Sequence, residues 1–221
     1  MNASMGANAG RRAVASQSSA PTPDDDLAGG EMARRILDMA YALFLDFGFR
    51  RTTMEDVARR LGTSRITLYR HFGDKDALFQ AVVIRECRRT MRAIQEQLAA
   101  VVAPEDFFVE GIVLTLTRAR AHPLIRRLLE TEPEWLLPHL TVKSGPLFSM
   151  ALAYGAGYFR EQQNHGHFRP FPSELASELL VRMMQSAVLT PGGLLASDNE
   201  DDVRQVARMI FLPLLKGSRM E

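Results

Sequence analysis

The sequence predicts an all-α protein of about nine helices. Apolar residues recur at three- and four-residue intervals through most of the 221-residue chain, which is the spacing that lines one face of a helix. No alternating apolar and polar run of useful length is present, so no strand is predicted. Proline and glycine separate the periodic stretches, as expected where helices end. We expect a small N-terminal helical domain over residues 31–92 and a C-terminal helical domain over residues 93–221.

The chain is expected to begin with a disordered tail over residues 1–30, which are rich in Ala, Ser, Gly, Asn and Pro and have no apolar face. The first helix starts at Glu31 and stops before Gly48, a residue suited to a helix C-terminus. Its apolar stripe consists of Met32, Ile36, Met39, Leu43 and Phe47.

We expect the next helices over residues 54–61, 64–71 and 75–100. The Thr53 hydroxyl can accept from the free N–H groups of the first of them, and Asp56 completes a near capping box. Gly62 ends that helix, and Ser64 caps the helix after it.

The rest of the chain is expected to form helices over residues 105–121, 122–130, 133–140, 146–165, 173–190 and 199–216. The last has the clearest apolar stripe, made of Val203, Val206, Ala207, Ile210, Phe211, Leu214 and Leu215. Pro213 falls late in this helix, and we expect a kink there.

The formal net charge of +1 is unevenly distributed. Residues 31–92 carry 13 Lys and Arg against 8 Asp and Glu, whereas residues 93–221 carry 12 against 15. A compact basic domain before a mildly acidic body is typical of a nucleic-acid-binding protein, because backbone phosphates attract Lys and Arg whatever the base sequence. Chance scatter of charges over solvated helix faces would give the same totals, so charge alone leaves both interpretations open.

Composition excludes several classes of protein. No stretch approaches the ~18 consecutive apolar residues of a membrane span, and residues 13–30 lack the apolar core of a signal peptide. The single cysteine, Cys87, excludes a disulfide within the chain and a cysteine-based zinc site. We therefore expect a cytoplasmic protein without cofactors. Whether Cys87 senses oxidants depends on its pKa, which the sequence leaves open.

Residues 53–72 have the order expected of a helix-turn-helix. Two short helices that cross steeply need a small residue where their backbones meet, here Ala58, and a residue that tolerates positive φ in the turn, here Gly62. The shared core is expected to consist of Val57, Leu61 and Leu68. The second helix then exposes Ser64, Arg65, Thr67, Tyr69, Arg70 and His71. A structural hairpin in a helical bundle, the alternative, would not need this basic and aromatic outer face.

This segment resembles the N-terminal signature of the TetR family of bacterial transcriptional regulators. The resemblance covers about residues 31–92, and beyond them only helix number and length agree. The matching residues, in order and spacing, are Phe47-Gly48-Phe49, Thr53, Val57-Ala58, Leu61-Gly62, Ser64, Thr67-Leu68-Tyr69, His71-Phe72, Lys75 and Leu78. Ile66 departs from the pattern, since many members carry Gly, Ala or Pro there. The resemblance implies a repressor whose helix 64–71 is the recognition helix, with DNA-contacting positions at Thr67, Tyr69, His71 and Lys75.

A recognition helix that enters the major groove N-terminus first brings its first residues to the base edges. Arg65 is the candidate for bidentate recognition of guanine, with Thr67 beside it. Ile66 can contact a thymine methyl or alter how deeply the helix enters the groove. The residues expected to read bases are Ser64, Arg65, Ile66, Thr67 and Arg70. Those expected to contact phosphates are Arg50, Arg51, Thr53, Tyr69, His71 and Lys75.

The C-terminal domain is expected to bind an effector and to form a homodimer. The resemblance implies a small hydrophobic effector that releases the protein from DNA, and the candidate lining residues are Trp135, Phe148, Tyr154, Tyr158 and Met183. Such a set is also what a plain core contains. The resemblance further implies that helices 173–190 and 199–216 pair with those of a second chain, although their stripes would equally serve packing within one chain. Twofold symmetry suits a palindromic operator on double-stranded DNA.

We find no catalytic or metal-binding constellation in the sequence. His165 and His167 form an H-x-H pair without a third ligand at a fixed spacing. Glu130, Glu132 and Glu134 are most simply a solvated acidic turn. No nucleophile elbow, phosphate-binding glycine loop or Cys/His dyad is present. We therefore predict a DNA-binding regulator and not an enzyme, with a helical protein–protein interaction module as the alternative.

Overall fold

The computed structural model describes residues 30–190 and 192–216, and within them every regular element is a helix. The all-α prediction is therefore confirmed. The predicted tail lies, apart from Gly30, outside the described residues. The helices are α1 (Gly30–Phe47), α2 (Met54–Leu61), α3 (Arg65–Phe72), α4 (Lys75–Leu98), α5 (Pro104–Ala121), α6 (Pro123–Thr131), α7 (Pro133–Leu140), α8 (Gly145–Asn164), α9 (Ser173–Leu189), α10 (Glu200–Val206), η1 (Ala207–Phe211) and α11 (Leu212–Lys216).

The last three segments are continuous, so the described residues form ten helical runs, one for each expected range, although the overall number was expected to be about nine. The expected kink near Pro213 takes the form of the π-helical segment η1, in which the Leu212 N–H bonds to the Ala207 carbonyl five residues back. Proline has no N–H to donate and its ring crowds the carbonyl four residues earlier, which explains why regular α-helical bonding is interrupted just before it.

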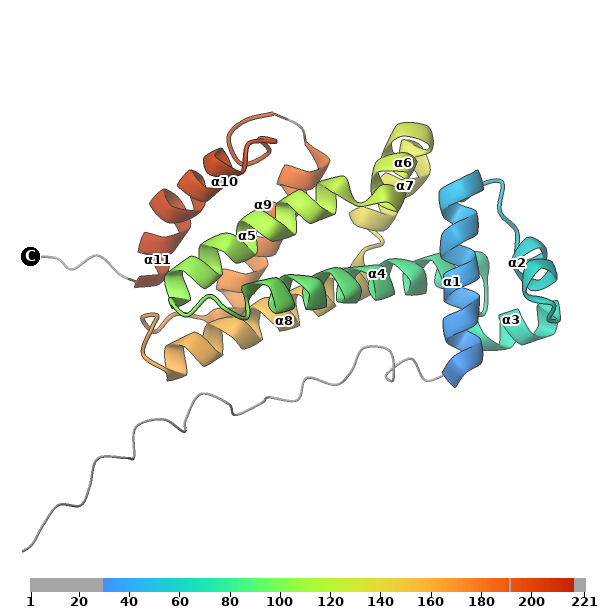
Figure 1. The fold of residues 1–221 in the computed structure, drawn as a ribbon, viewed down its shortest axis with the longest axis horizontal. Helices are drawn as coiled ribbons and strands as arrows, with labels where there is room; N and C mark the ends of the chain where they lie inside the picture. Colours follow the sequence, from blue (N-terminus) through green and yellow to red (C-terminus); the bar gives the residue numbers. More distant parts are fainter. Residues whose placement is uncertain (1–29, 191, 217–221) are drawn as a thin grey trace, which may run out of the picture.

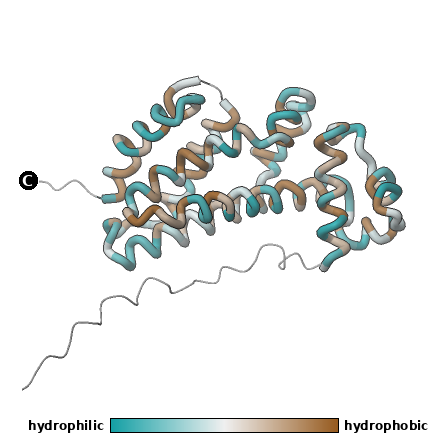
Figure 2. Tube along the Cα trace, viewed as in Figure 1, coloured by the Kyte–Doolittle hydropathy of each residue, from teal (hydrophilic) through white to brown (hydrophobic). Residues whose placement is uncertain are grey.

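The helices are arranged along one long axis (Figure 1). The three helices α1–α3 form a head at one end, and α4 runs from this head into the body, where α5 and α8–α11 lie. The pair α6–α7 lies beside the junction, between head and body. Hydrophobic and hydrophilic residues alternate along every helix in Figure 2, as expected when one face of each helix packs inward.

Two apolar cores correspond to the head and the body. The head core is built mainly from α1, α2 and the first half of α4, but Leu124, Leu128 and Leu136 from α6 and α7 are fully buried in it. The predicted domain boundary at residue 92 thus lies inside α4, and a segment from beyond that boundary completes the head.

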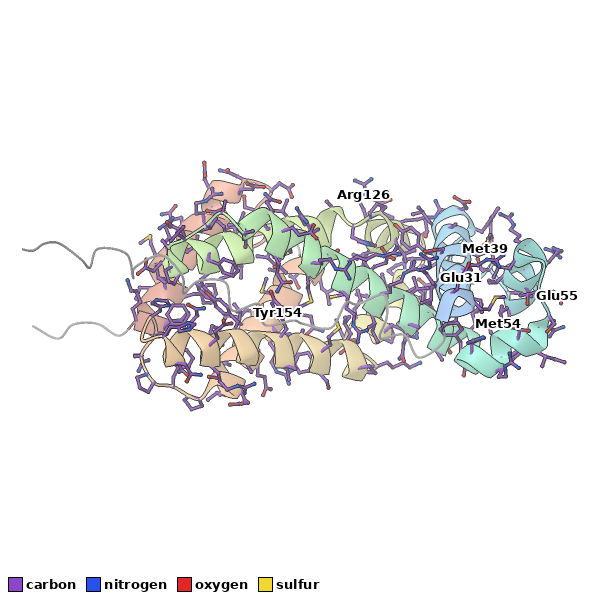
Figure 3. All side chains as sticks on the ribbon, turned by 60° about the horizontal axis from the view of Figure 1, so that its bottom comes forward. Glu31, Met39, Met54, Glu55, Arg126 and Tyr154 are labelled. Carbon is purple, nitrogen blue, oxygen red and sulfur yellow. The ribbon has the colours of Figure 1, made fainter. Side chains whose placement is uncertain are left out.

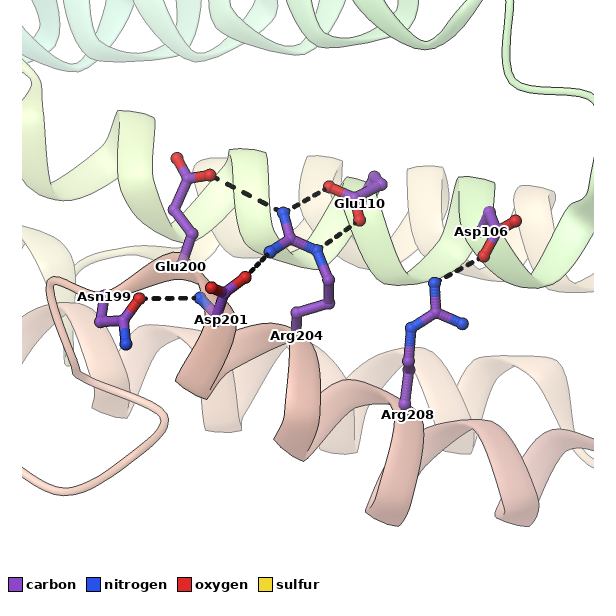
Figure 4. Close-up of polar contacts among 7 residues, drawn as sticks. All are labelled: Asp106, Glu110, Asn199, Glu200, Asp201, Arg204 and Arg208. Carbon is purple, nitrogen blue, oxygen red and sulfur yellow. Dashed lines mark hydrogen bonds and ion pairs between the residues drawn. The ribbon is translucent and has the colours of Figure 1, made fainter.

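The helix α10–η1–α11 is fixed to α5 by charge as well as by apolar packing. Arg204 forms a bidentate pair with Glu110, with N–O distances of 2.6 and 3.0 Å, and Arg208 pairs with Asp106 at 2.6 Å (Figure 4). The side of the helix facing α5 buries Val203, Ala207, Phe211 and Leu215. Four of the seven stripe residues therefore pack within the chain. Two others, Ile210 and Leu214, are exposed, as is the neighbouring Met209.

Candidate DNA interface

The helix-turn-helix has the local geometry that its caps predict. The Thr53 hydroxyl accepts from the Asp56 N–H at 3.1 Å, while the Asp56 carboxylate accepts from the Thr53 N–H at 3.0 Å, which completes the capping box. Gly62 has φ 66° and ψ 32°, the left-handed conformation required at the turn. Ser64 accepts from the Thr67 N–H at 3.1 Å and so begins α3. These three predictions are confirmed.

Helix α3 fully buries only Leu68; Arg65, Ile66, Tyr69 and Arg70 are exposed, whereas Thr67, His71 and Phe72 are half-buried. Leu68 is fully buried against the head, as are Val57 and Ala58 from α2, whereas Leu61 is half-buried. In contrast, Ile66 is 78% exposed and Tyr69 is 44% exposed. Ile66 and Tyr69 are therefore accessible to a partner on the same outer face of α3 as Arg65 and Arg70.

The arginine expected to read guanine is available at the surface. Arg65 forms an ion pair with Glu55 of α2 at 3.3 Å, and both side chains are more than half exposed. Glu55 lies at the outer end of the head, away from the body (Figure 3). Exposed pairs of this kind contribute only ~0.2–1 kcal/mol, so a guanine edge can replace Glu55 as the partner of Arg65. The other basic residue of the base-reading set, Arg70, is exposed as well.

The residues expected to contact phosphates fall into different environments. Arg51 is exposed, and His71 is half-buried near the C-terminus of α3. The side chain of Arg50, in contrast, contacts α7, because its guanidinium forms an ion pair with Glu134 at 2.7 Å. The Thr53 hydroxyl donates to the Asp56 carboxylate at 2.6 Å and is therefore engaged in the cap.

Lys75 has a placement that the sequence did not indicate. Its ammonium donates to the backbone carbonyls of Phe49 at 3.1 Å and Thr52 at 3.0 Å, and it lies 4.1 Å from the centre of the Phe49 ring. Burial lowers the pKa of Lys75, although the nearby Asp76 and Glu132 oppose this shift. These contacts fix the α1–α2 loop to the start of α4, a structural role that the sequence did not predict.

The five tentative effector residues are not brought together. Trp135 belongs to the head, where its ring stacks on Phe49 with centroids 3.4 Å apart. Tyr158 stacks on Phe107 in the body, and burial raises its pKa. Tyr154 projects from α8 toward α4 (Figure 3), and Met183 is 36% exposed on α9.

The fifth residue, Phe148, lines an open groove between the α7–α8 turn and α9, with a volume of about 670 Å³. The guanidinium of Arg182 lies 4.9 Å from the centre of the Phe148 ring at this groove. The groove is of the size that small ligands occupy, and apolar and polar side chains both line it.

Glu132 is the residue whose environment differs most from the sequence-based interpretation. It is 8% exposed and not a solvated turn residue, and its carboxylate accepts from the Arg50 N–H at 3.0 Å. The available signal was its place directly before Pro133, a break between two helices where a side chain can leave the helical surface.

The described residues give no support for a reactive cysteine or for a metal site. Burial raises the pKa of the Cys87 thiol to about 11, so that little thiolate is present at neutral pH. Within residues 30–190 and 192–216, no three His, Cys, Asp or Glu side chains gather into a metal site. No helix in the same ranges combines the length and apolar character needed to cross a membrane.

A basic recognition helix exposed at one end of an elongated all-helical protein defines a DNA-binding regulator of the helix-turn-helix class. Residues 36–82 match the family described as bacterial regulatory proteins, tetR family, and residues 105–211 match the Tetracyclin repressor C-terminal domain. A Mycobacterium tuberculosis protein, the uncharacterized HTH-type transcriptional regulator Rv1255c, is 30% identical over 178 residues, which are 80% of this chain and 83% of that protein.

Solved structures share the fold. The TetR family repressor AlkX from Dietzia sp., implicated in biodegradation of n-alkanes, aligns with a TM-score of 0.64 and 23% identity over 85% of this chain and 98% of that chain. The regulator FadR from Bacillus subtilis, in complex with stearoyl-CoA, aligns with a TM-score of 0.54 and 14% identity over 84% and 98% of the two chains. The protein belongs to the TetR family of helix-turn-helix transcriptional regulators.

Proposed function

We propose that this protein acts in the cytoplasm as a repressor that binds a palindromic operator as a homodimer. In this proposal residues 31–92 bind DNA and residues 93–221 bind effector and dimerise. The observation that carries the proposal is the exposed face of α3, where Ile66 and Tyr69 remain solvated beside two arginines. Arg65 reads a guanine together with Ser64, Ile66, Thr67 and Arg70, while Arg51, Tyr69 and His71 contact phosphates.

The dimer is proposed to form through α9, with a contribution from the last helix. Leu175, Leu179 and Met183 are exposed at four-residue intervals on one face of α9, which is the pattern of a helix that packs against a partner. One recognition helix gives a small interface, and two heads related by twofold symmetry double it. Sedimentation at micromolar concentration should therefore give a dimer, whereas a monomer that binds DNA specifically would contradict the symmetry argument.

The effector is proposed to be a small hydrophobic compound. The solved FadR structure, with the same fold, is in complex with stearoyl-CoA, and the groove beside Phe148 offers a site of suitable volume. Long-chain amphipathic compounds, beginning with stearoyl-CoA, can be screened for release of the protein from operator DNA. Phe148→Asp should abolish release by any compound that acts in this groove.

Base readout by Arg65 is tested by comparing two arginine variants. Operator sequences are first selected from random DNA by the wild-type protein, and affinities for the selected site and for an unrelated duplex are then measured by fluorescence anisotropy. Arg65→Ala should lose about 1–3 kcal/mol on the selected site and little on the unrelated duplex. Arg126→Ala, an exposed arginine on α6, is the matched control and should change neither. Equal losses of Arg65→Ala on both duplexes would remove the assignment.

A further inference from the structure

The loop between α1 and α2, residues 48–53, is held from two sides. On the α4 side, Lys75 binds the Phe49 and Thr52 carbonyls. On the other side lie residues of α6, α7 and the residue that joins these helices. We call the second group the loop clamp, and it consists of Arg127, Glu132, Glu134 and Trp135.

Glu132 is the most buried residue of the loop clamp. One carboxylate oxygen accepts from the Arg50 N–H at 3.0 Å, and the other occupies the space in which Gly48 would carry a side chain. A Cβ on Gly48 would lie 2.1 Å from that oxygen, and Gly48 also has φ +82°. Glycine at this position therefore serves the approach of Glu132 as well as the end of α1.

The other members of the loop clamp bind neighbouring points. The Trp135 ring stacks on Phe49 at 3.4 Å with the planes 16° apart. Arg127 donates to the carbonyl of Asp46 at 2.9 Å, near the end of α1. Glu134 pairs with the Arg50 guanidinium at the surface. Together they join a segment that follows α5 to the residues that lead directly into the cap of α2.

We propose that Glu132 is a positioning residue for DNA recognition, which sets the orientation of the helix-turn-helix relative to the body through the loop clamp. This inference rests on the DNA binding proposed above. The loop ends at Thr53, which caps α2, and α2 packs on α3. Because both heads of a dimer must fit one operator, a head that samples several orientations binds with an affinity reduced by the fraction of time it is correctly placed.

The first experiment compares operator binding by three variants on this segment. Glu132→Ala leaves the Arg50 N–H without its buried acceptor, and we expect operator affinity to fall about tenfold or more. Glu132→Gln keeps an acceptor oxygen and should restore most of the affinity. Glu130→Ala removes an exposed carboxylate near the end of α6, two residues before Glu132, and is the matched control. Affinity for an unrelated duplex should change little in all three, because it depends on charge and not on head spacing.

The second experiment measures the integrity of the loop clamp in the absence of DNA, by tryptophan fluorescence. Trp135 is the only tryptophan of the chain, so its fluorescence reports on this site alone. In Glu132→Ala the emission should shift to longer wavelength as water reaches the indole, whereas Glu130→Ala and Glu132→Gln should keep the wild-type spectrum. If Glu132→Ala does not fold, Glu132→Asp provides the same comparison, because its shorter side chain withdraws the carboxylate from the Arg50 N–H.

The outcomes separate the two proposals. Wild-type protein that selects no DNA sequence would overturn the proposed function, independently of the Trp135 spectra. A wild-type protein that binds its operator, together with a folded Glu132→Ala or Glu132→Asp that binds it equally well, would overturn the positioning role. A loss on the operator that Glu132→Gln does not restore would also overturn it, since the effect would then come from charge and not from the hydrogen bond.

Discussion

Replacing Lys75 by methionine distinguishes a structural lysine from one that contacts DNA phosphates. Methionine keeps the apolar stem and removes the ammonium, so the carbonyls of Phe49 and Thr52 lose their side-chain donor. A hydrogen bond from a charged group contributes about 1.5–3 kcal/mol, and the contact with the Phe49 ring adds about 0.5–1 kcal/mol. Desolvation of the ammonium opposes both, as the lowered pKa of Lys75 indicates. We expect a net loss of about 2–3 kcal/mol in the free energy of unfolding.

For a chain of this size that loss corresponds to a fall in Tm of about 5–10 °C. Lys143→Met, an exposed lysine in the turn after α7, is the control and should leave Tm unchanged. Tm is measured by circular dichroism, and operator affinity is measured in parallel at several salt concentrations. A lysine that contacts a phosphate steepens the salt dependence of log K by about one unit, so its removal would reduce the slope by that amount.

We expect the slope to be unchanged in Lys75→Met and reduced in Arg51→Met, because Arg51 is exposed. An unchanged Tm together with a reduced slope in Lys75→Met would refute the structural role and restore Lys75 to the phosphate contacts.

Two further predictions concern the body and the lone thiol. Hydrogen bonding to Arg204 lowers the pKa of Glu110, so its contribution to stability is full above the unfolded-state pKa and is lost as pH falls through the lower folded-state value. The difference in Tm between wild type and Glu110→Gln should therefore be largest near neutral pH and should shrink as the pH falls. The control variant at the exposed Glu96, Glu96→Gln, should show no such trend. A Tm difference that does not depend on pH would contradict the ion pair between Glu110 and Arg204. Burial raises the pKa of Cys87 to about 11, so iodoacetamide should label native protein slowly at pH 8 and unfolded protein quickly, as measured by mass spectrometry; fast native labelling would show an accessible thiolate.

The parts of the fold that the sequence predicts are those set by neighbours in the chain. Thr53, Gly62 and Ser64 act on backbone groups within a few residues, and their caps form as expected. Helix ends are likewise set by residues close in the sequence, and each range in which a helix was expected contains one. The exposure of Arg65, Tyr69 and Arg70 on α3 was also predicted, whereas Thr67 and His71, which were expected to be exposed, are half-buried.

The loop clamp could not be predicted in this way, because its partners are distant in the chain. Glu132 is separated from Arg50 by 82 residues, and Lys75 from Phe49 by 26. Helical periodicity assigns Trp135 to an inward face, but it does not say whether that face meets the head or the body. A basic or acidic residue near a turn is usually solvated, and only the packing of α6–α7 on the head makes Glu132 an exception.

The proline that ends α6 connects a signal that is local in the sequence with a contact between distant residues. Pro133 begins α7, and the residue before a proline is disfavoured in the helical conformation, so Glu132 has φ −142° and ψ 45° and belongs to neither helix. That local break was expected from the sequence, but its consequence was not: a side chain released from the helical surface turns toward the one position in the α1–α2 loop that has no Cβ. The break at Pro133 and the glycine at 48 are each ordinary helix-end signals. Only their juxtaposition in space makes them one contact, through which the body can position the recognition helix.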